Sequence, residues 1–202
     1  MDHPPISIPK QNTALAPLVV DLDGTLTLID TLIESIVQVL KHNPLNALKF
    51  PLWLLKGRAA FKEFIASKSS LSVENLPYHL ALLDYLRGEK AKGRRVILAT
   101  AAHRNIADRV AKYLDIFDTV LASDGTKNLK GTTKLDAIRA SVGDNFVYAG
   151  DSAADLPIWK AATAAILVGV SAGVSATVRQ STLIDHEFPR EDARLRTWLR
   201  AL

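Results

Sequence analysis

Short apolar segments alternate with helical segments along the second half of the chain. The segments expected to form buried strands are Arg95–Thr100, Thr119–Ala122, Asn145–Ala149 and Ala164–Val168. The expected helices between them are 103–114, 132–141 and 153–162. Strands that are joined by helices pair in parallel, because a parallel connection must cross over a face of the sheet. The alternation therefore predicts an α/β fold, with a parallel sheet flanked by helices on both faces.

One further strand is predicted at 18–22, well ahead of the others in the sequence. The stretch 29–80 that follows it has helical spacing and is interrupted by prolines and a glycine. We expect this stretch to form a small helical cap that is inserted after the first strand and placed over one end of the sheet. The core domain would then consist of residues 18–28 and 81–190.

The two ends of the chain are expected to lie outside the core. Residues 1–17 carry four prolines and no apolar segment of the signal-peptide type, so they predict a flexible lead. Residues 191–202 predict a basic amphipathic helix that carries Trp198.

Composition excludes several classes of protein. A hydrophobic content of 48% is too high for a disordered chain, and the absence of cysteine excludes disulfides and thiolate metal sites. No apolar run approaches the ~20 residues that span a bilayer. The net charge of +4 is mild, and the basic residues lack the aromatic neighbours that stack on bases, so no nucleic-acid partner is expected. These features fit a cytoplasmic protein.

Two carboxylates follow the first strand. Asp21 and Asp23 come directly after its apolar residues, and Gly24 then lets the chain turn. Residues i and i+2 of a strand point to the same side, so the two carboxylates would project together. Carboxylates this close repel each other unless a proton or a cation lies between them, and Mg²⁺ accepts such oxygen ligands. The alternative is a loop with two solvated turn residues.

Other polar residues follow the remaining strands. Ligands of open parallel sheets bind outside the carboxyl ends of the strands, so these positions are the candidates. They are Thr100 with Ala101, then Lys130 and Lys134 at the start of a helix, and Asp151 with Ser152 and Asp155. Each residue alone is explained as a cap, a turn or a surface charge, but together they indicate one site.

Four segments together resemble the haloacid dehalogenase-like (HAD) phosphohydrolase superfamily. They are Asp21-Leu-Asp23-Gly-Thr, Ile97-Leu-Ala-Thr100, Asn128-Leu-Lys130-Gly131 and Gly150-Asp151-Ser152-Ala-Ala-Asp155, and the resemblance covers about residues 18–170. It implies a Rossmann-like core in which the insertion at 29–80 is the C1 cap. It also implies a Mg²⁺-dependent phosphatase that acts on a phosphate monoester.

The resemblance implies a role for each catalytic residue. Asp21 would attack phosphorus and form an aspartyl-phosphate, and Asp23 would act as general acid and then as general base. Asp21, the backbone carbonyl of Asp23 and Asp151 would hold Mg²⁺.

The remaining residues would bind or support the phosphate. Thr100 and Ala101 would contact phosphoryl oxygens, and Lys130 would neutralise their charge. Lys134, one helical turn further on, is the second choice for that lysine. Asp155 and Ser152 would lie behind these groups, where Asp155 would orient the lysine or the water around the metal.

A narrower resemblance concerns the soluble HAD domain that precedes a UbiA-type membrane prenyltransferase in some bacterial fusion proteins. It rests on segments such as Pro17–Leu26, Pro51–Gly57 and Trp198–Leu202. It implies a polyprenyl-linked sugar phosphate as substrate and a membrane prenyltransferase domain as partner. Residues 191–202 would then link the two domains at the cytoplasmic face of the membrane. Apolar cap residues such as Trp53 could contact lipid, although packing within the cap is the simpler explanation.

Two other functions stay open. A small-metabolite phosphatase that resembles phosphoserine phosphatase would share the cap, but its cap would be expected to carry polar specificity residues, whereas this cap is rich in Leu, Phe and Trp. A regulatory or docking domain of a prenyltransferase would bind a phosphorylated ligand without turnover. The full set of candidate catalytic residues argues against this second alternative.

Overall fold

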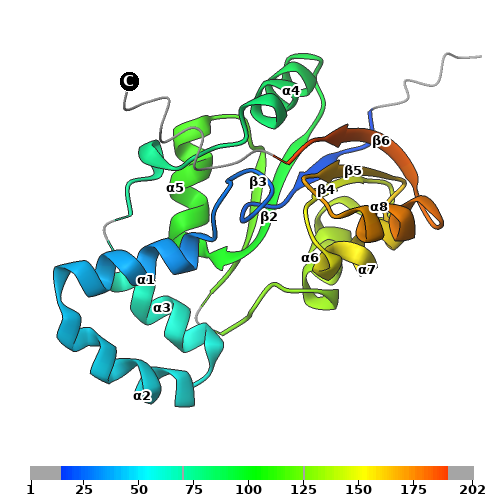
Figure 1. The fold of residues 1–202 in the computed structure, drawn as a ribbon. Coiled ribbons are helices and arrows are strands. Elements are labelled where there is room, and N and C mark those ends of the chain that lie inside the picture. Colours follow the sequence, from blue (N-terminus) through cyan, green and yellow to red (C-terminus); the bar gives the residue numbers. More distant parts are fainter. Residues whose placement is uncertain (1–14, 70, 125, 191–202) are drawn as a thin grey trace, which may run out of the picture.

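The computed structural model describes residues 15–190, apart from residues 70 and 125, and its centre is a six-stranded sheet (Figure 1). The strands are β1 (Leu18–Val20), β2 (Val96–His103), β3 (Thr119–Ser123), β4 (Val147–Gly150), β5 (Ala164–Val168) and β6 (Leu183–Phe188). They pair in the order β3-β2-β1-β4-β5-β6, and every pair is parallel. The predicted parallel α/β fold is confirmed. The expected helix at 191–202 and most of the expected N-terminal lead lie outside the described residues.

Helices cover both faces of the sheet. On one face α4 (Leu80–Ala91) and α5 (Arg104–Leu114) pack in a core that includes Leu18 and Val20 of β1. On the other face lie α6 (Thr132–Val142), α7 (Leu156–Ala161) and α8 (Ala172–Arg179), and the core there includes Val19 and Trp159. Successive residues of β1 thus enter opposite cores, which explains why this strand is apolar throughout.

Two elements have no counterpart among those predicted. The edge strand β6 leaves most of its side chains exposed, so it carries no apolar pattern. The short helix α8 consists largely of small residues.

A separate helical lobe lies beyond the carboxyl ends of the strands (Figure 1). It contains α1 (Thr31–His42), a 3₁₀ segment η1 (Pro44–Lys49), α2 (Phe50–Leu55) and α3 (Arg58–Lys68). Its own core is formed by Val39, Phe61, Phe64 and Ile65, against which Phe50 and Trp53 pack. Pro51 lies in the first turn of α2, where its missing N–H costs no helical hydrogen bond. No helix in the described part of the chain is long and apolar enough to cross a membrane.

Two paired segments, which we call the neck, join the lobe to the core. The backbone N–H of Leu28 donates to the carbonyl of Pro77 at 2.9 Å, and that of His79 donates to the carbonyl of Leu26 at 2.9 Å. Thr27 and Tyr78 face each other between these bonds as an antiparallel bridge. The chain leaves the core through the neck, but it returns to the core before the neck, because Leu71, Val73 and Leu76 around the 3₁₀ segment η2 (Val73–Asn75) already pack in the core with α5.

Candidate active site

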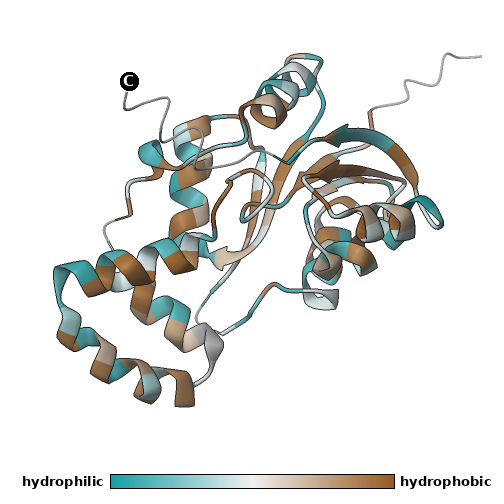
Figure 2. Cartoon of the chain, viewed as in Figure 1, coloured by the Kyte–Doolittle hydropathy of each residue, from teal (hydrophilic) through white to brown (hydrophobic). Residues whose placement is uncertain are grey.

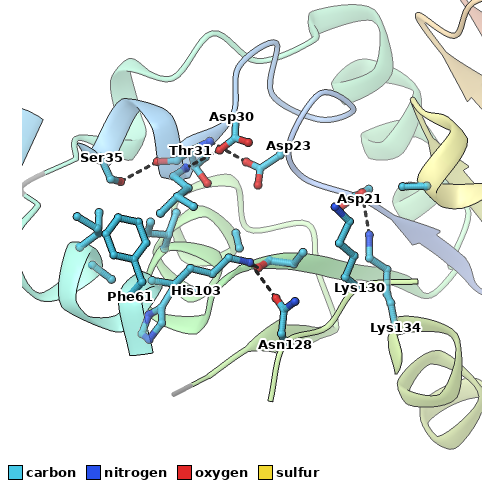
Figure 3. Close-up of a pocket in the computed structure, with 18 of the residues that line it drawn as sticks. Asp21, Asp23, Asp30, Thr31, Ser35, Phe61, His103, Asn128, Lys130 and Lys134 are labelled. Carbon is cyan, nitrogen blue, oxygen red and sulfur yellow. Dashed lines mark hydrogen bonds and ion pairs between the residues drawn. The ribbon is translucent and has the colours of Figure 1, made fainter. Parts of the chain in front are cut away.

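A cavity of about 460 Å³ lies between the lobe and the carboxyl ends of the strands. Core residues such as Asp21 and Asp23 line one side, and lobe residues such as Thr31 and Phe61 line the other (Figure 3). The predicted site residues that reach this cavity are Asp21, Asp23, Ala101, Lys130, Lys134, Asp151, Ser152 and Asp155. The structure thus brings together residues that lie as far apart in the sequence as 21 and 155.

Asp21 and Lys134 form a buried ion pair at the end of β1. Their Oδ2 and Nζ atoms are 2.7 Å apart, and their side chains are 13% and 4% exposed. The other oxygen of Asp21 accepts the backbone N–H of Leu22 at 2.7 Å. Burial raises the pKa of Asp21, which the ammonium of Lys134 opposes. Burial alone would lower the pKa of Lys134, but the carboxylates of Asp21 and Asp155 hold it above its ordinary value, so this lysine stays a cation.

Tyr148 and Asp155 hold the same lysine from behind. The Tyr148 hydroxyl accepts a hydrogen bond from Lys134 Nζ at 3.1 Å and donates one to Asp155 Oδ1 at 2.8 Å. Asp155 lies in the 3₁₀ segment η3 (Ala153–Asp155), and its other oxygen accepts the backbone N–H groups of Asp151 and Ser152 at 3.3 Å each. Tyr148 was not among the predicted site residues, because a tyrosine inside a buried strand has the same sequence pattern as any core residue.

Asp23 faces the lobe. Its Oδ1 accepts the backbone N–H of Thr31, the first residue of α1, at 2.9 Å. Burial raises the pKa of Asp23 to about 7. A carboxyl group with this pKa is present in both its acidic and its basic form near neutral pH, as a general acid and base requires. The sequence alone gave no signal for the contact with Thr31.

Three carboxylates gather where a cation could bind. Oxygens of Asp21, Asp151 and Asp155 lie within 4.8 Å of one another, whereas the Asp23 carboxylate turns to Thr31. Asp151 accepts the Thr25 hydroxyl at 3.2 Å, and burial raises its pKa to about 6. The three carboxylates carry more negative charge than Lys134 can neutralise, and their hard oxygen ligands fit a divalent ion such as Mg²⁺.

Gly24 permits the close approach of the turn after β1 to Asp151. Its φ is +77°, and a Cβ at this position would lie 2.4 Å from Asp151 Oδ2. Any side chain here would displace that carboxylate from the cluster.

Thr100 differs from the other predicted residues, because its side chain does not line the cavity. It is fully buried, and its hydroxyl oxygen accepts the backbone N–H of Ala102 at 2.9 Å. Its neighbour Ala101 does line the cavity, and the carbonyl of Ala101 accepts a hydrogen bond from Lys62 Nζ of α3 at 2.6 Å.

Lys62 also donates to the side-chain carbonyl of Asn128 at 2.9 Å, so it joins the lobe to two segments of the core. Nothing in the sequence distinguishes this lysine from the surface lysines around it. The two lysines that were predicted are placed differently from each other. Lys130 lines the cavity with an exposed side chain, and the ion pair with Asp21 belongs to Lys134.

Comparison with known proteins gives one family and several structural neighbours. Residues 18–160 match the family model of haloacid dehalogenase-like hydrolases. The chain is 39% identical over 188 residues to a Sinorhizobium fredii protein named "Uncharacterized protein y4nM", an alignment that covers 92% of this chain and 36% of that protein. The chain thus spans about a third of the length of this relative.

The solved structures share the fold at low sequence identity. A protein with unknown function from Bordetella pertussis Tohama I is 18% identical, with a TM-score of 0.63 and coverage of 86% of this chain and 99% of that one. A substrate-bound phosphoserine phosphatase is 16% identical, with a TM-score of 0.60 and coverage of 93% and 98%. Both likenesses show the arrangement of helices and strands.

Proposed function

The chain belongs to the haloacid dehalogenase-like hydrolase family, and from its site we propose that it is a Mg²⁺-dependent phosphatase of phosphate monoesters. The observation that carries the proposal is the buried pair of Asp21 and Lys134 beside Asp23, whose pKa is about 7. A carboxylate held by a lysine can serve as nucleophile, and a neighbouring carboxyl group that titrates near neutral pH can move the proton.

In the proposed reaction the carboxylate of Asp21 attacks phosphorus and forms an aspartyl-phosphate. Asp23 gives its proton to the leaving oxygen, and its carboxylate then takes a proton from the water that attacks the phosphorus. That water releases inorganic phosphate and restores the carboxylate of Asp21. A divalent cation held by Asp21, Asp151 and the backbone carbonyl of Asp23 would reduce the repulsion between the nucleophile and the phosphate.

We assign to Lys134 the charge-neutralising role that the sequence favoured for Lys130, because Lys134 contacts the nucleophile directly. Asp155 would act by holding Lys134 through Tyr148, and Ser152 by orienting Asp155 through its backbone N–H. For the phosphoryl oxygens we retain Ala101, which lines the cavity. Thr100 would contribute by fixing the backbone at Ala102.

For the substrate we propose a polyprenyl-linked sugar phosphate. The lobe side of the cavity supports this choice, because Leu54, Phe61 and Ile65 give it an apolar wall. The corresponding partner would be a membrane prenyltransferase domain, with the phosphatase at the cytoplasmic face of the membrane. The length of the Sinorhizobium fredii relative leaves room in that protein for a further domain.

A small-metabolite phosphatase similar to phosphoserine phosphatase is the second candidate. Asp30, which lines the cavity from the lobe side, favours it, because its carboxylate could pair with a cationic group of a small substrate. The third candidate, a docking domain without turnover, has less support, since it requires no ion pair at Asp21 and no acid of raised pKa at Asp23.

The test is phosphate release with Mg²⁺ from a panel that includes phosphoserine and isoprenoid-linked sugar phosphates. We expect release by the wild-type chain and none by Asp21→Asn, whose folding is checked by circular dichroism. Release from phosphoserine alone would favour the second candidate. No release from any substrate, or equal release by the variant, would contradict a phosphatase.

A further inference from the structure

Four exposed leucines lie along one short segment of the lobe. Leu45, Leu48, Leu52 and Leu55 are 68%, 78%, 59% and 86% exposed. They are spaced three, four and three residues apart along η1 and α2, and this spacing places residues on one helical face. We call this set the leucine stripe.

The leucine stripe is separate from the core of the lobe. The aromatic residues of α2 already face inward: the ring of Phe50 lies 5.4 Å from that of Phe61, and the ring of Trp53 stacks on Phe64 at 4.9 Å. The segment therefore has two apolar faces, of which the lobe covers one. Figure 2 shows apolar residues on α2 at the outer edge of the lobe, and the stripe leucines line neither of the two cavities described in residues 15–190.

The charge along the segment that carries the leucine stripe has one sign. Residues 35–62 contain no Asp or Glu, but five Lys and Arg residues. Lys49 and Lys56 directly follow Leu48 and Leu55, and both are exposed. Lys56 lies along the ring of Trp53, with its Nζ 4.4 Å from the ring centroid. Lysines beside an apolar face can bury their stems while the ammonium groups meet anionic headgroups.

We propose that the leucine stripe, with Lys49 and Lys56, docks the lobe on the surface of an anionic lipid bilayer. A helical segment with an apolar face and basic neighbours lies in the plane of the membrane interface, and its affinity comes from apolar burial together with attraction to anionic lipid. At ~1.5 Å per residue for α2 and ~2 Å per residue for η1, the two elements are far too short to span a bilayer, so this contact is peripheral. A protein partner that covered the stripe would need a complementary groove, whereas the bilayer accepts an outward-facing row of side chains.

The docking surface adjoins the catalytic cavity. Leu54 is 52% exposed and also lines the cavity, and it lies on α2 between Leu52 and Leu55. A docked lobe would therefore bring one wall of the cavity next to the lipid. The proposal goes beyond the phosphatase function, because the surface would bind lipid whether or not the site turns over a substrate.

The test is cosedimentation of the full chain with vesicles of phosphatidylcholine alone or with about a third phosphatidylglycerol. We expect binding only to the anionic vesicles and weaker binding at high salt. The triple variant Leu48→Ser/Leu52→Ser/Leu55→Ser should not bind. The double variant Lys49→Gln/Lys56→Gln, which removes both charges, should bind on the order of 30-fold more weakly, since each basic residue near the surface contributes about 1 kcal/mol.

Leu183→Ser is the matched control, because Leu183 is 73% exposed on β6, outside the lobe. It should bind like the wild type. Absence of binding to anionic vesicles, equal binding by the triple variant, or equal loss in the control would overturn the proposal. A dimer in the absence of lipid that the triple variant abolishes would also overturn it, because a second copy would then occupy the stripe. Phosphate release measured on the same samples reports separately on the phosphatase.

Discussion

Replacing Lys134 by methionine should cost this protein both stability and activity, whereas the same change at Lys130 should cost little of either. Methionine keeps most of the apolar stem of lysine but removes the charge and the hydrogen bonds to Asp21 and Tyr148. Asp21 and Asp155 would then be buried carboxylates without their cation. Breaking a buried ion pair by removing one partner costs about 3–5 kcal/mol of unfolding free energy.

Protonation gives a second estimate of the unfolding free energy that Lys134→Met would lose. The variant can remove the unpaired buried charge by protonating one carboxyl group. For an aspartate with an ordinary pKa of about 3.9 this costs roughly 4 kcal/mol at pH 7. The two estimates agree, and we expect Lys134→Met to lose about 4 kcal/mol. Lys130 is exposed and forms no ion pair with Asp21, so Lys130→Met should change the unfolding free energy by less than about 0.5 kcal/mol.

The measurements are urea unfolding at pH 7 in the presence of EDTA and the kcat/KM of phosphate release with Mg²⁺. Removing a group that stabilises charge in the transition state costs about 10²–10³ in rate, which is our expectation for Lys134→Met. Lys130→Met should lower kcat/KM less than tenfold. The reasoning would be refuted if Lys130→Met lowered kcat/KM a hundredfold and Lys134→Met lowered the unfolding free energy by less than about 1 kcal/mol. The catalytic role would then return to Lys130.

Four further substitutions test other parts of the site and the lobe. Gly24→Ala and Gly93→Ala should each lose about 1–2 kcal/mol in urea unfolding, because both residues have positive φ. Only Gly24→Ala should lose phosphate release, because nothing lies within 4 Å of a Cβ at Gly93; equal activities would contradict the close approach to Asp151. Asp151→Asn should raise the Mg²⁺ concentration for half-maximal activity at least tenfold, and an unchanged titration would remove Asp151 from the metal site. Phe64→Ala should lose about 3–5 kcal/mol of packing in the lobe, so limited proteolysis should cleave residues 31–68 faster; an unchanged rate would contradict that packing.

The sequence predicted the central strands well, because they are buried on both faces. β5 was expected at Ala164–Val168 and is found there, with every residue buried. β6 was not predicted, because most of its side chains are exposed and its sequence has no run of apolar residues that would distinguish it from a loop.

For the site, the sequence could place each residue at a strand end but not choose among neighbours. Lys130 and Lys134 are four residues apart, but Lys130 precedes α6 and Lys134 lies within it, so the path of the chain before α6 decides which of them reaches Asp21. Gly131, with φ of +58°, sets that path. Contacts such as that of Tyr148 with Lys134 depend on side chains that cross between elements, and no local pattern records them.

The neck is a site at which the lobe could be exchanged for another insert. Its two segments already run antiparallel and are joined by backbone hydrogen bonds, as the arms of a β-hairpin are. Closing a longer loop costs little, about 0.6 kcal/mol for each doubling of length, so the core can carry inserts of very different size at this point. A graft would need to match the short ladder between Leu26 and His79 and to keep Leu71, Val73 and Leu76, which pack in the core. With those residues retained, the neck is the natural junction for chimaeras in which the lobe is exchanged to change substrate preference while the carboxylates of the core stay in place.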